Sequence, residues 1–129
     1  MRLKEQVCQV TGAGSGIGRA ITQCFAKKGA TVVAVDVDVD AVKTTQEKIT
    51  IAGGICHSLS VDVSQEDEVK GAIATTVERF GQRNVLHNNA GISLLKPVTE
   101  TTEADFDRLL GVNLKGVFFG CKLAIPYML

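Results

Sequence analysis

A glycine-rich turn between a predicted strand and a predicted helix constrains the fold of this chain more than any other feature. Residues 11–18 read Thr-Gly-Ala-Gly-Ser-Gly-Ile-Gly, an apolar run over 7–10 precedes them, and apolar residues recur at helical spacing over 17–28. At such a corner glycines let backbone amides approach a ligand, and the helix N-terminus adds free N–H groups and the positive end of its dipole. The turn is therefore a candidate phosphate site, although glycines also serve tight turns for conformational reasons alone.

The acid at the end of the next predicted strand supports the phosphate site. The β-branched run 31–35 ends at Asp36, eighteen positions after Gly18. This is close to the spacing of the acid that holds the adenosine ribose in dinucleotide-binding βαβ units. Asp36 could instead simply end a strand, where turn-forming residues are common. The strand, glycine turn, helix, strand and acid in this order favour a dinucleotide site.

Periodicity predicts an α/β fold for the whole chain. In the helix predicted over 17–28, the apolar residues expected to face the core are Ile17, Ala20, Ile21, Cys24 and Phe25. The later predicted elements are a helix over 40–52 closed by Gly53-Gly54, a strand over 55–61, a helix capped by Ser64 with Asp67 and closed by Gly81, a strand over 85–88, a loop over 92–101, and a helical region from Thr102 and Asp105 to at least Ile125. Strands that alternate with helices imply a parallel sheet with right-handed crossovers.

Several ordered motifs make the chain resemble the short-chain dehydrogenase/reductase family from about Leu3 to its last residue. They are the turn in the form Thr-Gly-x-x-x-Gly-x-Gly, Asp62-Val63 after the third strand, Asn88-Asn89-Ala90-Gly91 after the fourth, and Asn113 in the last helical region. The resemblance implies a Rossmann-like, doubly wound parallel sheet of strand order 3-2-1-4, truncated relative to the full family fold. Residues 1–129 would then form one NAD-binding domain, with the nucleotide across the C-terminal strand ends.

The resemblance also implies which residues contact the cofactor. They are Gly12, Ser15, Gly16, Ile17 and Gly18 in the turn, Asp36 at the ribose, Asp62 and Val63 at the adenine, and Asn89, Ala90 and Gly91 near the cofactor's ribose. Thr11 would tie the first strand to the asparagine turn. In their ordinary structural interpretation, Asp62 ends a strand before a helix cap, and residues 88–91 form a plain turn.

NAD is the expected cofactor rather than NADP. A carboxylate at Asp36 accepts hydrogen bonds from ribose hydroxyls, whereas a 2′-phosphate beside it costs about 4 kcal/mol per charge pair at an effective dielectric of about 20, before screening. The basic residue that often marks NADP-preferring relatives is absent, since Ser15 stands in its place and Val37 adds no charge.

The catalytic residues of the family have no counterpart in these 129 residues. Family members transfer a hydride between a nicotinamide and an alcohol or carbonyl, using a serine and a Tyr-x-x-x-Lys pair. The single tyrosine is Tyr127, and residues 124–128 match the helix that precedes the serine strand. Asn113, which in the family helps hold a water of the proton relay, would be a supporting residue only. Because lost acid–base catalysis forfeits about 10²–10⁴-fold in rate, we expect no turnover from residues 1–129 alone.

Three functions remain open from the sequence. The first is the NAD-binding portion of an oxidoreductase whose small alcohol or carbonyl substrate binds only in a complete chain. The second is a non-catalytic dinucleotide-binding sensor or an interfering partner of full-length relatives. The third is a scaffold whose glycine turn holds no ligand.

Composition excludes several other classes. Fourteen basic and fourteen acidic residues balance without a basic stripe, which argues against nucleic acid and anionic membranes as partners. The apolar stretches are strand-sized or interrupted by charge, and the N-terminus lacks an apolar signal region, so we expect a soluble, cytoplasmic protein. The four cysteines, Cys8, Cys24, Cys56 and Cys121, form no C-x-x-C pair and are expected to be buried, reduced thiols. His57 and His87 lack ligand spacing, so no metal site is expected.

Some features predict looser packing and self-association. Gln9, Arg83 and Asn84 depart from the residues usual in the family and could loosen the core. The fourth strand would expose an unpaired edge, and an apolar helix face would lack part of its cover, so we expect a homo-oligomer. The residues of that face are Val117, Phe118, Phe119, Leu123 and Ile125.

Overall fold

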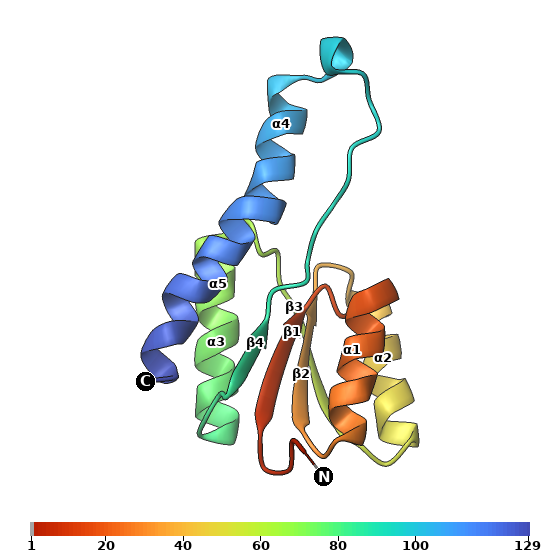
Figure 1. The fold of residues 1–129 in the computed structure, drawn as a ribbon, viewed down its shortest axis with the longest axis vertical. Coiled ribbons are helices and arrows are strands. Elements are labelled where there is room, and N and C mark those ends of the chain that lie inside the picture. Colours follow the sequence, from red (N-terminus) through yellow and green to blue (C-terminus); the bar gives the residue numbers. More distant parts are fainter. Residues whose placement is uncertain (1) are drawn as a thin grey trace.

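Four parallel strands form one sheet in the computed structural model, which describes residues 2–129. The strands are β1 (Val7–Thr11), β2 (Thr31–Asp36), β3 (Ile55–Ser60) and β4 (Val85–His87). Their order is β3-β2-β1-β4, which confirms the predicted 3-2-1-4 arrangement (Figure 1). Cys8 pairs with Val32 on one side and with Val85 on the other, so the chain starts at the middle of the sheet.

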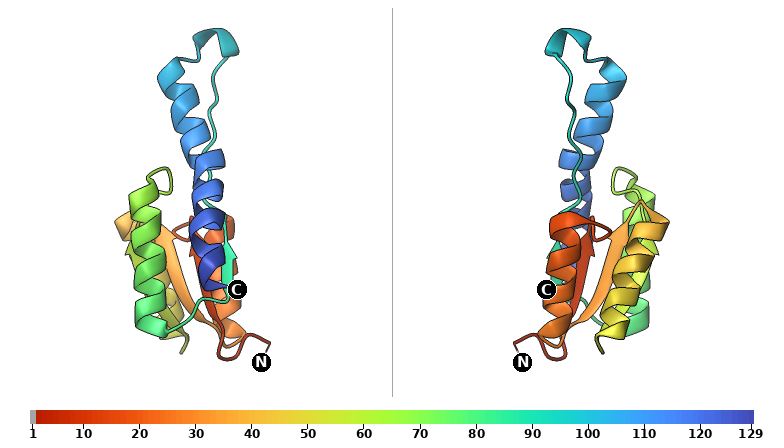
Figure 2. Two further views of the ribbon diagram at one scale, coloured as in Figure 1. Left: turned by 90° about the vertical axis from the view of Figure 1, so that its left-hand side faces the viewer. Right: turned by 90° about the vertical axis from the view of Figure 1, so that its right-hand side faces the viewer.

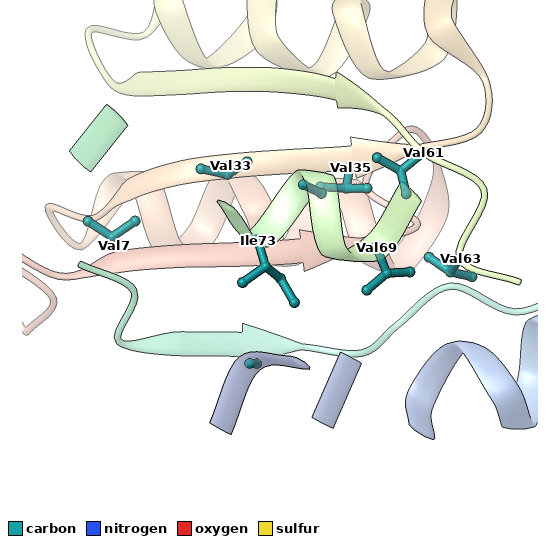
Figure 3. Packing of buried hydrophobic residues seen from close by; sticks show 9 residues of the cluster. Val7, Val33, Val35, Val61, Val63, Val69 and Ile73 are labelled. Carbon is teal, nitrogen blue, oxygen red and sulfur yellow. The ribbon is translucent and has the colours of Figure 1, made fainter. Parts of the chain in front are cut away.

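Helices cover both faces of the sheet and complete the doubly wound fold (Figure 2). On one face lie α1 (Gly16–Lys27) and α2 (Val39–Ile51), and on the other lie α3 (Glu66–Phe80) and α5 (Gly116–Ala124). Alternate residues of β2 supply the two cores, since Val32 and Ala34 face α1 and α2 whereas Val33 and Val35 face α3 and α5. Burial on both faces is why β2 reads as a continuous apolar run from Val32 to Val35. Figure 3 shows Val33 and Val35 among the valines of the second core, with Ile73 of α3.

The helix ends agree in part with the sequence-based predictions. Gly53 (φ 87°) and Gly81 (φ 73°) follow α2 and α3 in the left-handed conformation that favours glycine. Thr102 caps α4 (Glu103–Leu110) in a reciprocal capping box with Asp105, as predicted. The predicted cap at Ser64 is wrong, because its hydroxyl donates to Asp62 Oδ1 (2.7 Å) and α3 begins after Gln65.

The predicted apolar stripe of α1 is confirmed in part, since Ile21 and Phe25 pack against the core but its other three residues do not. Ile17 is 73% exposed, Ala20 and Cys24 are also exposed, and the fully buried residues of α1 are Gly18 and Thr22. A Cβ on Gly18 would overlap the Gly12 carbonyl, so the helix touches the strand end through the bare Gly18 backbone. This contact turns the Gly18–Thr22 side toward the sheet, and Ile17 and Cys24 therefore face outward.

The C-terminal helical region is interrupted and extends beyond the sheet. After α4 comes a π-helical segment (Gly111–Lys115), then α5 and a 3₁₀ turn (Ile125–Tyr127). A further 3₁₀ turn, Val98–Glu100, lies in the preceding loop. Figure 1 shows this loop and α4 rising past the carboxyl ends of the strands. The 25-residue stretch Glu103–Tyr127 is long and apolar enough to cross a membrane, by length and composition alone. It is therefore longer than the strand-sized apolar runs expected from the sequence. Phe119, Leu123 and Ala124 within this stretch pack on the core.

The polar residues that depart from the family pattern have different surroundings. Buried Gln9 accepts a hydrogen bond from Thr76 Oγ1 (3.4 Å), and Asn84 Oδ1 accepts from the amide of Val7 (2.7 Å). Arg83 is 1% exposed, and its three guanidinium nitrogens have no hydrogen-bond partner among residues 2–129. Burial lowers the pKa of Arg83 to about 10. Only Arg83 therefore leaves a buried charge uncompensated.

The four cysteines are free, but they are not all buried. Cys8 and Cys56 lie in the core, whereas Cys24 and Cys121 are exposed. The expectation of burial is wrong for the two helical cysteines, because α1 and α5 turn other side chains toward the sheet.

Candidate functional site

A cavity of about 540 Å³ lies at the carboxyl ends of the strands, where the crossovers diverge. Its lining residues are Gly12, Ser15, Gly16, Ile17, Asp36, Val37, Val61, Asp62, Val63, Ser64, Asn89, Ala90, Gly91, Ile92, Arg108 and Val112. Every residue predicted to contact a cofactor is in this set except Gly18, which lies beneath the turn. The cavity is within the range of about 300–1,000 Å³ typical of small-molecule sites.

The glycine turn leaves backbone amides available at the N-terminus of α1. Gly12 (φ 66°) and Gly16 (φ 51°) adopt the left-handed conformation. A Cβ on Gly12 would lie 2.8 Å from Ala90 Cα, whereas one on Gly16 would meet no atom within 4 Å. Ser15 precedes α1 without a side-chain cap, and the first turn of the helix has no acidic residue. The helix end therefore keeps its unpaired N–H groups and positive dipole for an anion.

Asp36 is held rigidly at the wall of the cavity. Its Oδ2 accepts a hydrogen bond from the amide of Gly14 (2.8 Å), and its Oδ1 accepts one from the amide of Asp38 (3.0 Å). Each carboxylate oxygen can accept a further bond. The side chain is thus an oriented acceptor pair beside the glycine turn.

Asp62 provides a second carboxylate on the wall formed by the end of β3. Its Oδ1 accepts from the amide (3.0 Å) and the hydroxyl (2.7 Å) of Ser64. These two bonds fix the side chain and leave Oδ2 as the acceptor for a ligand. The interaction that displaced the predicted helix cap at Ser64 is therefore part of the site.

Thr11 connects the two turns that border the cavity. Its Oγ1 accepts from the amides of Asn89 and Ala90, both at 3.0 Å, and lies 3.5 Å from the carbonyl oxygen of His87. Asn89 Nδ2 also donates to the Gly12 carbonyl (3.3 Å). The expected tie between the first strand and the asparagine turn is confirmed.

Asn113 lies outside the cavity lining, in the π-helical segment. Its Oδ1 accepts from the amide of Ile92 and its Nδ2 donates to the carbonyl of Ile92, both at 2.8 Å. The side chain therefore replaces a backbone pair and holds the loop after β4 against the helix. The water-holding role implied by the family resemblance stays a prediction.

The sequence reasoning missed the wall contributed by α4 and the π-helical segment. Arg108 and Val112 line the cavity from there. Their i, i+4 spacing, which puts them on one helix face just before Asn113, was the available signal. Their position depends on how closely the helix approaches β3, and the sequence does not show this.

The cavity lining carries three charged side chains. Its ionisable residues are Asp36, Asp62 and Arg108, and it contains no Tyr, Lys, His or Cys. Over residues 2–129 no cluster of three His, Cys, Asp or Glu side chains could hold a metal ion. The arrangement can hold a polyanion at a helix end and hydroxyl or amino groups at two carboxylates.

Comparison with known proteins gives consistent relatives. The family model described as short chain dehydrogenase matches residues 6–129. The 3-oxoacyl-[acyl-carrier-protein] reductase of Thermotoga maritima is 37% identical over 129 residues, which are 100% of this chain and 52% of that protein. The 3beta-hydroxysteroid dehydrogenase 2 of Eggerthella lenta is 35% identical, with 98% of this chain and 49% of that protein covered.

A solved structure agrees with both relatives. A metagenomic short-chain oxidoreductase in complex with NADP superposes with a TM-score of 0.95 at 33% identity, covering 99% of this chain and 58% of that chain. This chain spans about half the length of the curated relatives it matches.

Proposed function

Because this chain belongs to the short-chain dehydrogenase/reductase family, we propose that it is the NAD-binding part of an oxidoreductase that transfers a hydride between a nicotinamide and an alcohol or carbonyl. The observation that carries the proposal is the uncapped N-terminus of α1, which shares one cavity with Asp36 and Asp62. Family membership supports an oxidoreductase role for the fold, and the shared cavity supports these residues as its cofactor site.

Each part of the cavity fits one part of a dinucleotide. The diphosphate would lie on the amides of the glycine turn, where the helix dipole favours negative charge. The ribose hydroxyls would donate to Asp36, and the adenine amino group would donate to the free oxygen of Asp62. A bound nicotinamide would supply or accept the hydride. The residues of this chain orient the dinucleotide and close off part of it from water.

We propose NAD rather than NADP as the preferred cofactor. The metagenomic relative was solved with NADP, so the family fold by itself does not decide between the two. In this chain the Asp36 carboxylate is fixed by Gly14 and Asp38, and it cannot turn away from a 2′-phosphate without losing both bonds. Neither Ser15 nor Val37, which line the cavity beside it, offers a positive charge. Repulsion by the fixed carboxylate therefore favours NAD.

A second candidate is a dinucleotide-binding protein without catalysis, acting as a sensor or as an interfering partner of full-length relatives. The absence of Tyr, Lys, His and Cys from the cavity lining favours it over a self-sufficient enzyme. Both candidates share the binding step and differ in whether further chain supplies the acid–base groups.

Self-association and a cytoplasmic location complete the proposal. Phe118 and Ile125 of the C-terminal helices are 57% and 51% exposed, and β4 is an edge strand with one neighbour. Exposed apolar faces and open strand edges favour association between copies. Free exposed thiols at Cys24 and Cys121 fit a reducing compartment. Light scattering should show a dimer or larger species, and Phe118→Glu should shift it toward monomer.

Calorimetric titration with NADH and NADPH tests the cofactor proposal. We expect NADH to bind at least about tenfold more tightly than NADPH, because a single charge pair of this kind exceeds 1.4 kcal/mol. Asp36→Asn should reduce or reverse the preference for NADH over NADPH. Asp40→Asn, on the exposed first turn of α2, should leave the ratio of the two affinities unchanged. No binding of either ligand at millimolar concentration would refute the function, and equal affinities for both would refute the preference.

A further inference from the structure

Arg108 is the one basic side chain in the lining of the cavity. It comes from α4, is exposed, and shares the cavity with the carboxylates of Asp36 and Asp62. The two ion pairs among residues 2–129 are Lys96–Asp105 and Lys122–Glu66, and neither uses Arg108. Asp105, the acid one turn before it, is occupied by Lys96 and by the amide of Thr102. The guanidinium is therefore available to a ligand.

Two close helix contacts place Arg108 beside the wall that carries Asp62. A Cβ on Gly111 would lie 3.3 Å from Ser64 Cβ, and one on Gly116 would lie 2.8 Å from Val63 Cγ2. The helical region thus crosses directly over Val63 and Ser64. Arg108 lies three residues before Gly111, which is about one turn or 4.5 Å along the axis. Its side chain therefore stands at the open edge of this wall, on the same helix face as Val112.

The chemistry of this corner fits the face of a purine ring. Ser64 holds Asp62 Oδ1, which leaves Oδ2 free to accept from the edge of a ring, and Val63 and Val112 offer apolar contact. A planar guanidinium stacks on aromatic rings, including nucleobases, while its charge stays partly hydrated. A phosphate partner is less suitable here, because the glycine turn after β1 already offers backbone amides to a phosphate.

We propose that Arg108 is an adenine-binding residue that stacks on the base held by Asp62 and so selects adenine dinucleotides. This rests on the proposed function, since it assigns a contact within the same cavity. Arg108 closes the side of the adenine site that β3 leaves open. Because base stacking contributes substantially to nucleotide affinity, its loss should weaken binding on the order of tenfold.

Titration of matched variants with NADH and ADP-ribose tests this assignment. Arg108→Gln should weaken both ligands about tenfold, and Arg108→Lys should recover less than half of that loss on a logarithmic scale, because an ammonium keeps the charge but cannot stack. Arg79→Gln is the control, since that guanidinium lies 3.0 Å from His57 on β3, outside the cavity lining. It should change neither affinity.

An NMR signature separates stacking from general electrostatic attraction. The side-chain Nε–H resonance of Arg108, assigned by its loss in Arg108→Gln, should move upfield when ADP-ribose binds, because it would lie over the ring face. Unchanged affinity in a folded Arg108→Gln variant, full recovery by lysine, or no upfield shift would each overturn the assignment. Failure of the unmodified chain to bind NADH would instead overturn the proposed function.

Discussion

The amide of Gly14 donates a 2.8 Å hydrogen bond to Oδ2 of Asp36, which joins the turn after β1 to the end of β2. The contact is close enough that a Cβ on Gly14 would lie 2.8 Å from the same oxygen and 2.9 Å from Ala41 Cβ. Glycine is needed here for proximity, since Gly14 is not among the residues with positive φ. The glycine turn proposed to bind the diphosphate and the carboxylate proposed to bind the ribose are thus held together by direct contact.

Gly14→Ala should separate these two sites. We expect it to displace the Asp36 carboxylate, destabilise the fold by about 1–3 kcal/mol through overpacking, and weaken NADH binding. Urea denaturation and calorimetry measure the two effects. Gly71→Ala is the matched control, because Gly71 is an exposed position of α3 and a Cβ there would meet no atom within 4 Å. It should stabilise the chain by about 0.5–1 kcal/mol. Equal stability and equal NADH affinity of the two variants would contradict the contact-dependent link between Gly14 and Asp36.

Arg83→Leu should stabilise the protein. The buried guanidinium lacks a partner among the described residues, and its desolvation is uncompensated. Replacing such a charge with an apolar side chain of similar volume gains about 1–4 kcal/mol. Urea denaturation at pH 7 measures the gain, and a loss of stability would show that Arg83 has an acceptor.

Comparing Arg83→Leu with the unmodified protein should reveal the pH dependence that burial of Arg83 implies. Burial lowers the pKa of Arg83 to about 10 in the folded state, well below its value in the unfolded chain, so below pH 10 folding carries the full cost of the buried cation. Between these values the unfolded chain binds more protons, and stability rises with pH. The advantage of Arg83→Leu should therefore shrink above pH 10. An advantage that stays constant to pH 12 would contradict this.

Thiol labelling should show two exposed, reactive cysteines and two buried, unreactive ones. Cys24 and Cys121 are exposed, while burial raises the pKa of Cys8 and raises that of Cys56 to about 11. Since the thiolate is the reactive form, we expect iodoacetamide at pH 8 to modify two thiols quickly and the other two only after unfolding. Mass spectrometry of the digested protein identifies them.

The raised pKa of Cys56 also has a consequence for stability. The buried, protonated Cys56 thiol contributes its full share to folding stability below pH 9, the pKa of an unburied thiol. This contribution is lost as the pH rises toward 11, because the core disfavours the thiolate. Cys56→Ala should remove this part of the alkaline loss of stability. An unchanged pH profile would argue that Cys56 stays protonated throughout.

The 129 residues by themselves should bind NADH without turning it over. The Tyr-x-x-x-Lys pair of the family is absent from residues 1–129, and the cavity lining contains no Tyr, Lys, His or Cys. Incubation with NAD and a panel of secondary alcohols should produce no steady increase in absorbance at the NADH band. Steady production by material of verified mass would refute this expectation, and adding the second half of a relative in trans is the complementary test.

The sequence by itself determined the strands and helices, the capping of α4 and the location of the cavity, whereas the strand order followed from the resemblance to the family. Alternating periodicities specify the strands and helices, and parallel strands bring their carboxyl ends to one edge. The turn after β1, Asp36, Asp62 and the turn after β4 all follow strand ends, so local signals sufficed to place them together. Thr102 was recognisable because a capping box is complete within four residues.

Only the tertiary structure decided which way the helices face and what they add to the site. The bare contact of Gly18 with the Gly12 carbonyl turned α1 so that Ile17 and Cys24 point outward, against their apolar periodicity. Ser64 bonded Asp62 instead of capping α3, and the approach of Gly111 to Ser64 brought Arg108 into the cavity. These outcomes depend on contacts between residues distant in sequence, and periodicity within one element carries no information about them.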